Sequence, residues 1–250
     1  MADATGLQQK DNLCGPFWVA RILRDSGVEV WDGEAVDEDC VAWRVGTVLP
    51  DPSDGSVPPG ATSLTGYRFD LPRVAPVESG TSAGALADAL EAASGGALRV
   101  VPVRGDWTAE RVEQLLDGAS RLGRVRLLAN VRTGRFWGSR PPLDTLLAEL
   151  RGEPAEGPPA EWDVGHFCEL VLVVRGPGGS LVLVHDSYPS FGWNARHLQP
   201  PRAVAAALGR GDGREGGVLA VASSETAAEV ESLARALGLE LGIWDNGTRS

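Results

Sequence analysis

The sequence predicts an α+β protein in which an N-terminal helix packs against an antiparallel sheet. The run "CGPFWVARIL", which starts at Cys14, places its large apolar residues on one helical face. The segments "HFCELVLVV" (166–174) and "LVLVHD" (181–186) are typical of strands, and the "RGPGGS" between them has the turn chemistry of a hairpin. Because a hairpin pairs its strands antiparallel, we expect the second half of the chain to build a sheet.

Composition narrows the class of protein. The 250 residues, 43% of them hydrophobic, suffice for one substantial core or two small ones. Acidic residues outnumber basic ones 34 to 23, and the arginines are scattered along the sequence, which argues against binding to nucleic acid. No run approaches the roughly 18 apolar residues of a membrane helix, and the N-terminus lacks the order of a signal peptide. With only three cysteines, we expect a cytoplasmic protein without membrane or disulfide framework.

The first third of the chain predicts two helices and a long loop. A helix is expected from about 14 to 26, because a proline occupies its first turn and a glycine follows its far end. Residues 35–49 also look helical. Residues 50–80 are rich in Pro, Gly, Ser and Asp without a period, which predicts a loop that lies on the surface or forms a site. The next helix should begin at Thr81 or Ser82.

The rest of the chain alternates strands and helices. We expect residues 1–222 to form one domain and residues 223–250 to form a helix and strand extension packed on it. In order, the predicted elements are a strand at 97–103, a helix at 109–122 capped by Thr108, a strand at 126–131, a short helix at 143–151, the hairpin, a strand at 216–223, a helix at 226–238 and a short strand at 239–244.

Three residues in this framework suggest a thiol site. Cys14 stands where its helix begins, whereas a cysteine needed only for packing would sit inside the apolar stripe. His166 begins one strand and Asp186 closes the next, so their side chains can meet at one edge of the sheet. A helix N-terminus and a nearby imidazolium both stabilise a thiolate. The set suits attack of a thiolate on a carbonyl, with an imidazole that carries the proton and an acid that orients it.

Further candidates surround these three residues. Gln8, six residues before Cys14, can direct its side-chain amide at a developing oxyanion beside the backbone N–H of Cys14, and Gln9 is the alternative. Trp162 and Trp193 lie in predicted loops that flank the pair, where they are candidates for the wall of a peptide-binding cleft.

The same segments resemble a known family. "QQKDNLCGPF", "GHFCELVLVV" and "LVLVHDSYP" are similar to the papain-like cysteine peptidases, particularly the C39-like peptidase branch. A helix and strand like "ERVEQLLDGASRLGRVRLLANV" commonly precede the histidine strand there, so the resemblance covers residues 8–26 and 110–222. It implies a papain-like fold and cleavage of a peptide amide bond through a thiol acyl-enzyme. The roles it implies are Gln8 or Gln9 at the oxyanion, Cys14 as nucleophile, His166 as base and Asp186 as its orienter.

The other cysteines and histidines are better explained by packing. Cys168 shares a strand face with His166, which makes it a rival thiol, but such a residue more often belongs to the core. Cys40 falls on a predicted helix between apolar neighbours. His185 lies on the strand face opposite to Asp186, and His197 falls in a polar loop. No CxxC or HxxxH spacing supports a metal site, so we expect neither metal nor cofactor.

Two other functions remain open at this stage. The same fold and residues would serve an acyltransferase or transamidase that acts on a peptide or a carrier-bound acyl group. They would also serve a peptide-binding module that no longer catalyses a reaction. A peptide or protein is the expected partner in each case, and the sequence does not predict the oligomeric state.

Overall fold

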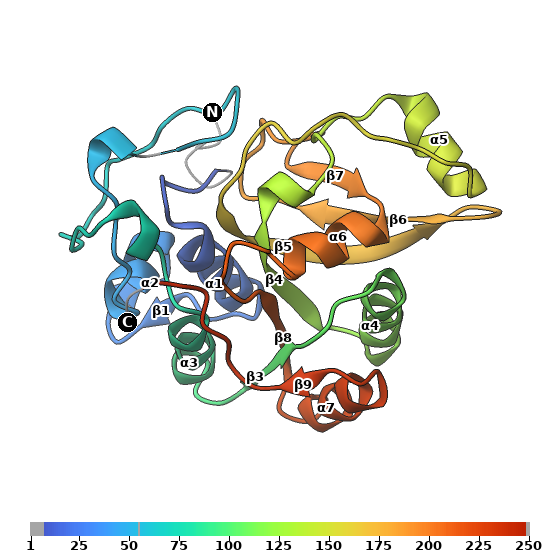
Figure 1. The fold of residues 1–250 in the computed structure, drawn as a ribbon. Helices are drawn as coiled ribbons and strands as arrows, with labels where there is room; N and C mark the ends of the chain where they lie inside the picture. Colours follow the sequence, from blue (N-terminus) through green and yellow to red (C-terminus); the bar gives the residue numbers. More distant parts are fainter. Residues whose placement is uncertain (1–7, 55, 249–250) are drawn as a thin grey trace.

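An antiparallel sheet forms the centre of the protein. The computed structural model describes residues 8–54 and 56–248, and within them seven strands pair in the order β7-β6-β5-β4-β8-β3-β9 (Figure 1). A separate two-stranded hairpin is formed by β1 (Val30–Trp31) and β2 (Glu34–Ala35). The strands of the sheet are β3 (Leu98–Arg104), β4 (Arg126–Arg132), β5 (Gly165–Arg175), β6 (Ser180–His185), β7 (Arg196–Gln199), β8 (Gly217–Ser223) and β9 (Glu240–Leu241).

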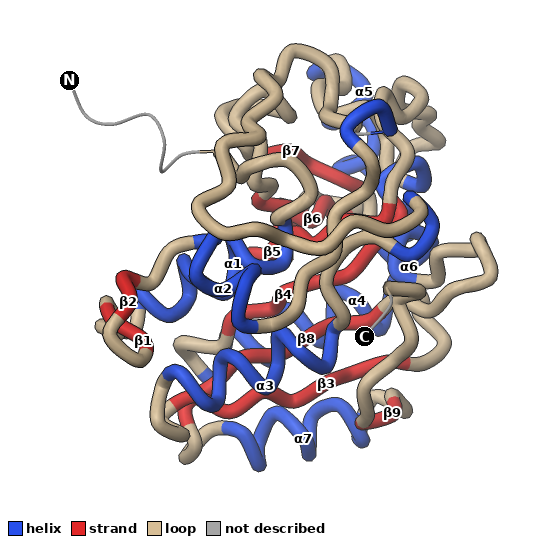
Figure 2. The backbone as a smooth tube through the Cα atoms, turned by 90° about the vertical axis from the view of Figure 1, so that its left-hand side faces the viewer, coloured by secondary structure: helices blue, strands red, loops and turns tan. Residues whose placement is uncertain are grey.

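Helices cover both faces of this sheet. One core cluster joins α1, α2 and α3 to one face, and a second joins α4, α6 and α7 to the other. Figure 2 looks onto the first three helices, with the strands behind them. None of the helices in the described ranges is both long and apolar enough to cross a membrane. The helices are α1 (Cys14–Asp25), α2 (Glu38–Arg44), α3 (Ala83–Ala93), α4 (Ala109–Leu122), α5 (Leu143–Arg151), α6 (Pro201–Leu208) and α7 (Ala227–Ala236).

Several sequence predictions are confirmed. The bounds of α4 and α5 are those expected, and the mixed α+β class with an N-terminal helix and a large antiparallel sheet is observed. Ser82 caps α3, because its hydroxyl accepts the backbone N–H of Ala85 at 3.2 Å. Thr108 caps α4 in the same way, through the N–H of Arg111 at 3.2 Å. Each cap satisfies one of the N–H groups that a helix start leaves without a partner.

The helix expected over 35–49 is wrong in its extent. The helix α2 covers only Glu38–Arg44 and is capped by the carboxylate of Asp37, which accepts the N–H of Cys40 at 2.8 Å. Gly46, with a φ of 66°, follows the helix in the left-handed region that a glycine adopts without strain. The predicted helix was too long because the apolar residues continue to Leu49, whereas the helix ends at Arg44.

The second half of the chain contains two elements that were not predicted, β7 and α6. His197, expected in a polar loop, is instead a fully buried residue of β7 that pairs with Val184 of β6. The sequence of β7, "RHLQ", has a single apolar residue and so shows no alternation. The helix α6 begins at Pro201, with Pro200 at its cap, and these two prolines mask the apolar run that follows.

One side chain fixes the position of α1 on the sheet. The indole of Trp18 is fully buried, and its Nε1 donates a hydrogen bond to the backbone oxygen of Phe167 at 3.1 Å. Near the start of the helix, a Cβ at Gly15 would lie only 2.6 Å from Leu86, so the first turn of α1 packs directly against α3. The start of α1 is thereby held beside the first residues of β5.

The C-terminal residues complete the same sheet. The strand β9 pairs with β3, and the indole of Trp244 donates to Asn130 of β4 at 3.3 Å while its ring packs in the cluster of α1 and α3. The strand expected at 239–244 is shorter, because only Glu240–Leu241 pair with β3. Residues 223–248 thus share their core with the rest of the chain.

Replacing Trp18 by Phe tests how α1 is held. The substitution keeps an aromatic ring but removes the N–H, so the oxygen of Phe167 loses its partner in a buried place; we expect the free energy of unfolding to fall by about 1–3 kcal/mol. Urea denaturation measures the change. Trp43→Phe is the matched control, because Trp43 is 49% exposed, and it should cost less than about 0.5 kcal/mol. Equal losses in both variants would contradict this account.

Candidate active site

Cys14 occupies the first position of α1. The residue before it, Leu13, ends a turn in which its N–H donates to Lys10 at 3.1 Å, and Asn12 has a φ of 62°. No described side chain caps this helix, and its first turn carries no acidic residue. The free backbone N–H groups and the positive end of the helix dipole are therefore available to the Cys14 sulfur or to a ligand bound beside it.

His166 and Asp186 form a buried pair at the edge of the sheet. His166 is the second residue of β5, and β6 pairs antiparallel with β5 until His185, so Asp186 follows at the strand end. The Nε2 of His166 lies 3.2 Å from Oδ2 of Asp186, an ion-pair contact without the alignment of a hydrogen bond. The other carboxylate oxygen accepts the N–H of Tyr188 at 3.0 Å. With Nε2 facing Asp186, Nδ1 is the nitrogen left to serve Cys14.

The protonation states follow from burial and from these neighbours. Burial opposes the charge of His166, but the carboxylate of Asp186 and the sulfur of Cys14 raise its pKa to about 10. Burial alone would raise the pKa of Cys14; the imidazolium of His166 and the backbone N–H groups of Phe167 and Gly15 outweigh it, so the pKa is lowered. At neutral pH His166 is accordingly an imidazolium, and the lowered pKa of Cys14 favours its thiolate form.

A cavity of about 450 Å³ opens onto this pair, and we call it the Cys14 cavity. Its walls come from distant parts of the chain, including the N-terminal segment, the 50–80 loop and the loop before β5. Near the reacting groups it is lined by Gln9, Asn12, Cys14, Trp162, His166 and Tyr188. The volume lies within the range of ligand sites in proteins.

The two glutamines proposed for the oxyanion differ in position. Gln9 is buried and lines the Cys14 cavity, where its amide nitrogen donates to the Tyr188 hydroxyl at 3.0 Å. Its amide oxygen accepts the hydroxyl of Ser187 at 2.5 Å. The amide of Gln8 instead donates to the backbone oxygen of Thr62 at 2.6 Å, and Gln8 is not among the lining residues. Gln9 is therefore the glutamine that the fold brings to the cavity.

The two tryptophans also differ. Trp162 stands edge-on to the imidazole of His166, with ring centroids 5.1 Å apart, and its Nε1 donates to the hydroxyl of Ser56 at 2.8 Å. It thereby joins the 50–80 loop to the loop that precedes β5, above the histidine. Trp193 lies in the turn before β7, is half exposed and does not line the Cys14 cavity.

None of the remaining thiols and histidines lines the Cys14 cavity. Cys40 and Cys168 are fully buried, and burial raises the pKa of Cys168 well above its usual value. His185 faces Glu169 at 3.4 Å, on the side of the sheet that α1 covers. Burial lowers the pKa of His197 to about 4, so this histidine is neutral at pH 7. Within the described ranges, no cluster of three or more His, Cys, Asp or Glu is arranged to hold a metal ion.

The far end of the Cys14 cavity is polar, which was not predicted from the sequence. Asn130 and Arg132 of β4 reach it, together with Arg210 and Arg214 from the loop that joins α6 to β8. The signal in the sequence is "GRGDGREGG" at 209–217, where glycines alternate with charged residues in a segment too rich in glycine to favour a helix. The arginines are scattered along the sequence, but the fold gathers three of them at one place.

The geometry defines a Cys-His-Asp cluster at a helix N-terminus, set against an antiparallel sheet within an α+β fold. The chain belongs to a family described as "Family of unknown function (DUF6885)", whose sequence profile matches residues 1–245. No curated protein and no solved structure matches the chain significantly. Function must therefore be argued from the residues of the site.

Alkylation by iodoacetamide tests the state of Cys14. An ordinary thiol with a pKa near 8.5 gains thiolate roughly seventyfold between pH 6 and pH 8. Because the pKa of Cys14 is lowered, its rate should already be high at pH 6 and should rise much less over this range. Mass spectrometry of the timed reaction gives the rate for each cysteine. Preferential labelling of Cys40 or Cys168 in the folded protein would contradict the assignment.

His166→Ala supplies the control for this measurement. Without the imidazolium, burial raises the pKa of Cys14, so labelling at pH 6 should slow and the steep dependence on pH should return. His185→Ala is the matched variant, because it removes a histidine on the other side of the sheet. Identical pH profiles for the wild type and His166→Ala would rule out His166 as the partner of the thiol.

Proposed function

We propose that the protein is a papain-like cysteine peptidase that cleaves a peptide amide bond through a thioester on Cys14. The observation that carries this proposal is the contact of three groups at the Cys14 cavity. Cys14, a thiol with a lowered pKa at a helix N-terminus, lines the cavity beside His166, and Asp186 lies behind the histidine, 3.2 Å from its far nitrogen. Nucleophilic thiol catalysis needs these three roles in this order.

The reaction uses only groups of this chain and water. The Cys14 thiolate attacks the carbonyl carbon and forms a C–S bond, while the carbonyl oxygen becomes an oxyanion. His166 gives its proton to the leaving nitrogen, the C–N bond breaks and the amine departs, which leaves a thioester. Water then attacks the thioester, gives a proton to His166 and displaces the thiolate, so the enzyme returns to its initial state. Asp186 stays ionised and holds the imidazolium in place.

The oxyanion would be stabilised at the start of α1. The backbone N–H groups of Cys14 and Gly15 belong to the first turn, where the helix offers N–H groups without a partner inside it. Gln9 is the side chain that supports this role, since it lines the cavity and is fixed by Ser187 and Tyr188. Its amide hydrogens are donated to Lys10 and Tyr188, so the oxyanion would share one of them.

The arrangement of the elements supports the papain-like part of the proposal. The helix that carries Cys14 packs by Trp18 on the strand that carries His166, and Asp186 follows the neighbouring strand. Helices lie on the Cys14 side of the cavity and the antiparallel sheet on the His166 side. This is the division expected from the resemblance of the N-terminal and hairpin segments.

Trapping the thioester tests the proposed reaction. The protein is incubated with a pool of peptides and quenched in acid, and an acyl adduct is expected on Cys14 because the thiolate must bond covalently to the carbonyl. Peptide mapping by mass spectrometry locates it. The Cys14→Ala variant should bind the same peptides without forming an adduct.

The products separate the three functions. Cleaved peptides support the peptidase. Water is present at about 55 M, so a product that carries an amine added at millimolar concentration requires a site that binds the acceptor and excludes solvent, and it would indicate a transferase. Equal binding by the wild type and Cys14→Ala, without adduct or turnover, would leave only a peptide-binding module.

A further inference from the structure

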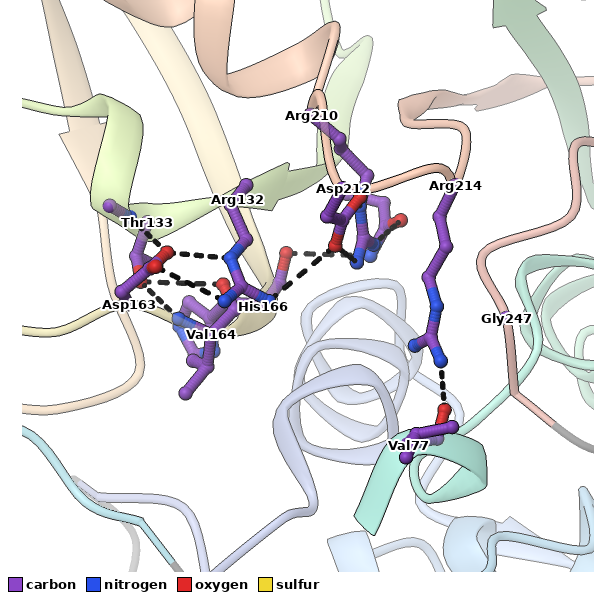
Figure 3. A network of polar contacts seen from close by, with 12 residues as sticks. Val77, Arg132, Thr133, Asp163, Val164, His166, Arg210, Asp212, Arg214 and Gly247 are labelled. Atoms are coloured by element: carbon purple, nitrogen blue, oxygen red, sulfur yellow. Dashed lines mark hydrogen bonds and ion pairs between the residues drawn. The ribbon is translucent and has the colours of Figure 1, made fainter.

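Three arginines line one end of the Cys14 cavity. Arg132 comes from the end of β4, and Arg210 and Arg214 come from the loop between α6 and β8 (Figure 3). The lining residues also include the carboxylates of Asp163 and Asp212, so these five side chains carry an excess of one positive charge. The chain as a whole has a net charge of −11. The positive charge at this end of the cavity is therefore opposite in sign to the net charge of the chain, which suggests that it has a specific role.

Two of the arginines are compensated by the two carboxylates. Arg132 holds Asp163 through two nitrogens, at 2.5 and 3.1 Å, and reaches Asp212 at 3.5 Å. Arg210, which is 2% exposed, holds Asp212 at 2.8 and 3.2 Å. Its remaining nitrogen donates to Asn130 at 3.1 Å. These forked pairs leave neither guanidinium with a free charge.

Arg214 is the third arginine, and none of the carboxylates that the structure describes compensates its charge. Among the side chains that the structure describes, no carboxylate lies within ion-pair distance of it, and its one hydrogen bond there goes to the backbone oxygen of Val77, on the opposite wall. A Cβ at Gly247 would lie 2.2 Å from its Nε, so the side chain packs against bare backbone there. The guanidinium is thus held across the end of the cavity by neutral groups, with donors left over.

We propose that Arg214 binds a carboxylate of the substrate, so that the Cys14 cavity selects peptides with an acidic group near the bond attacked. The proposal rests on the role of Cys14 proposed above and adds the substrate class. A guanidinium presents parallel N–H groups that match a carboxylate in a forked pair. The excess of one positive charge suits a monoanion, whereas a dianionic phosphate would leave negative charge beside Asp163 and Asp212.

The carboxylate has two possible sources in a peptide, namely the side chain of Asp or Glu and the C-terminal carboxyl group. Iodoacetyl peptides distinguish them without any need for turnover, because the Cys14 sulfur bonds to the iodoacetyl carbon and iodide leaves. One pair carries Glu or Gln with an amidated C-terminus. A second pair is built of glycine spacers of one to three residues and ends in a free acid or an amide.

The measured quantity is the ratio of alkylation rates on Cys14, acid probe over matched amide probe. It should exceed one in the wild type for one pair or the other, and Arg214→Gln should lower it by roughly fivefold, because a charge-assisted pair is replaced by a neutral contact. Arg214→Lys should keep part of the preference. Arg121→Gln is the control with the same charge change, since Arg121 is exposed on α4. High salt should reduce the ratio in the wild type.

The outcomes separate this inference from the proposed reaction. A ratio that is the same in the wild type, Arg214→Gln and Arg121→Gln for both pairs overturns the carboxylate site, whatever Cys14 does. If Cys14 reacts with neither probe, the role of the thiol fails instead. The carboxylate site is then tested by calorimetric binding of the acid and amide peptides, without the iodoacetyl group, to Cys14→Ala with and without Arg214→Gln. Equal affinity for acid and amide there would overturn it.

Discussion

The site depends on the buried contact between His166 and Asp186. An imidazolium away from water is costly unless an opposite charge lies close to it, and here the carboxylate of Asp186 lies 3.2 Å from Nε2. That compensation raises the pKa of His166 to about 10, and the resulting charge in turn lowers the pKa of Cys14. Removal of Asp186 would lower the pKa of His166, because burial opposes its charge, and a neutral His166 would no longer lower the pKa of Cys14.

The fold maintains this contact by tying together segments that are far apart in the sequence. The β5–β6 pairing places Asp186 beside His166, and Trp18 ties α1 to the backbone of Phe167, the residue after the histidine. Trp162 covers the imidazole and is itself held by Ser56 of the 50–80 loop. The same loop supplies Val77, which receives Arg214 at the other end of the cavity. The packing of Trp18, the cover that Trp162 gives to the imidazole and the placement of Arg214 therefore all concern the cavity around the Cys14 thiol.

The structure shows which features a sequence reveals and which it conceals. The helices α4 and α5 were predicted within their observed bounds, since each has a clear apolar period and a recognisable start or stop. His166 and Asp186 were expected to meet because a hairpin relates the ends of its strands through local turn chemistry. The strand β7 was missed, because "RHLQ" is buried by its neighbours and not by its own apolar pattern. His197 accordingly was assigned to the wrong environment.

The far end of the Cys14 cavity is a clearer example of a feature that cannot be predicted from the sequence. Arg132 and Arg214 belong to different strands and loops, and only the β4–β8 pairing, with the loop before β8, brings them to one wall. The spacing of the arginines in the sequence does not predict that they lie close together in the fold. The choice between Gln8 and Gln9 was hidden for a similar reason, because it depends on Ser187 and Tyr188, nearly two hundred residues away in the sequence.

The ionisation of His166 is the most direct test of this account. The chain has three histidines, so ¹⁵N NMR of the imidazoles can be assigned with single His→Gln variants and followed with pH. Both nitrogens of His166 should remain protonated at pH 8, since its pKa is raised to about 10. His197 should be neutral down to about pH 4. A neutral His166 at pH 7 would contradict the thiolate–imidazolium pair on which the proposed chemistry depends.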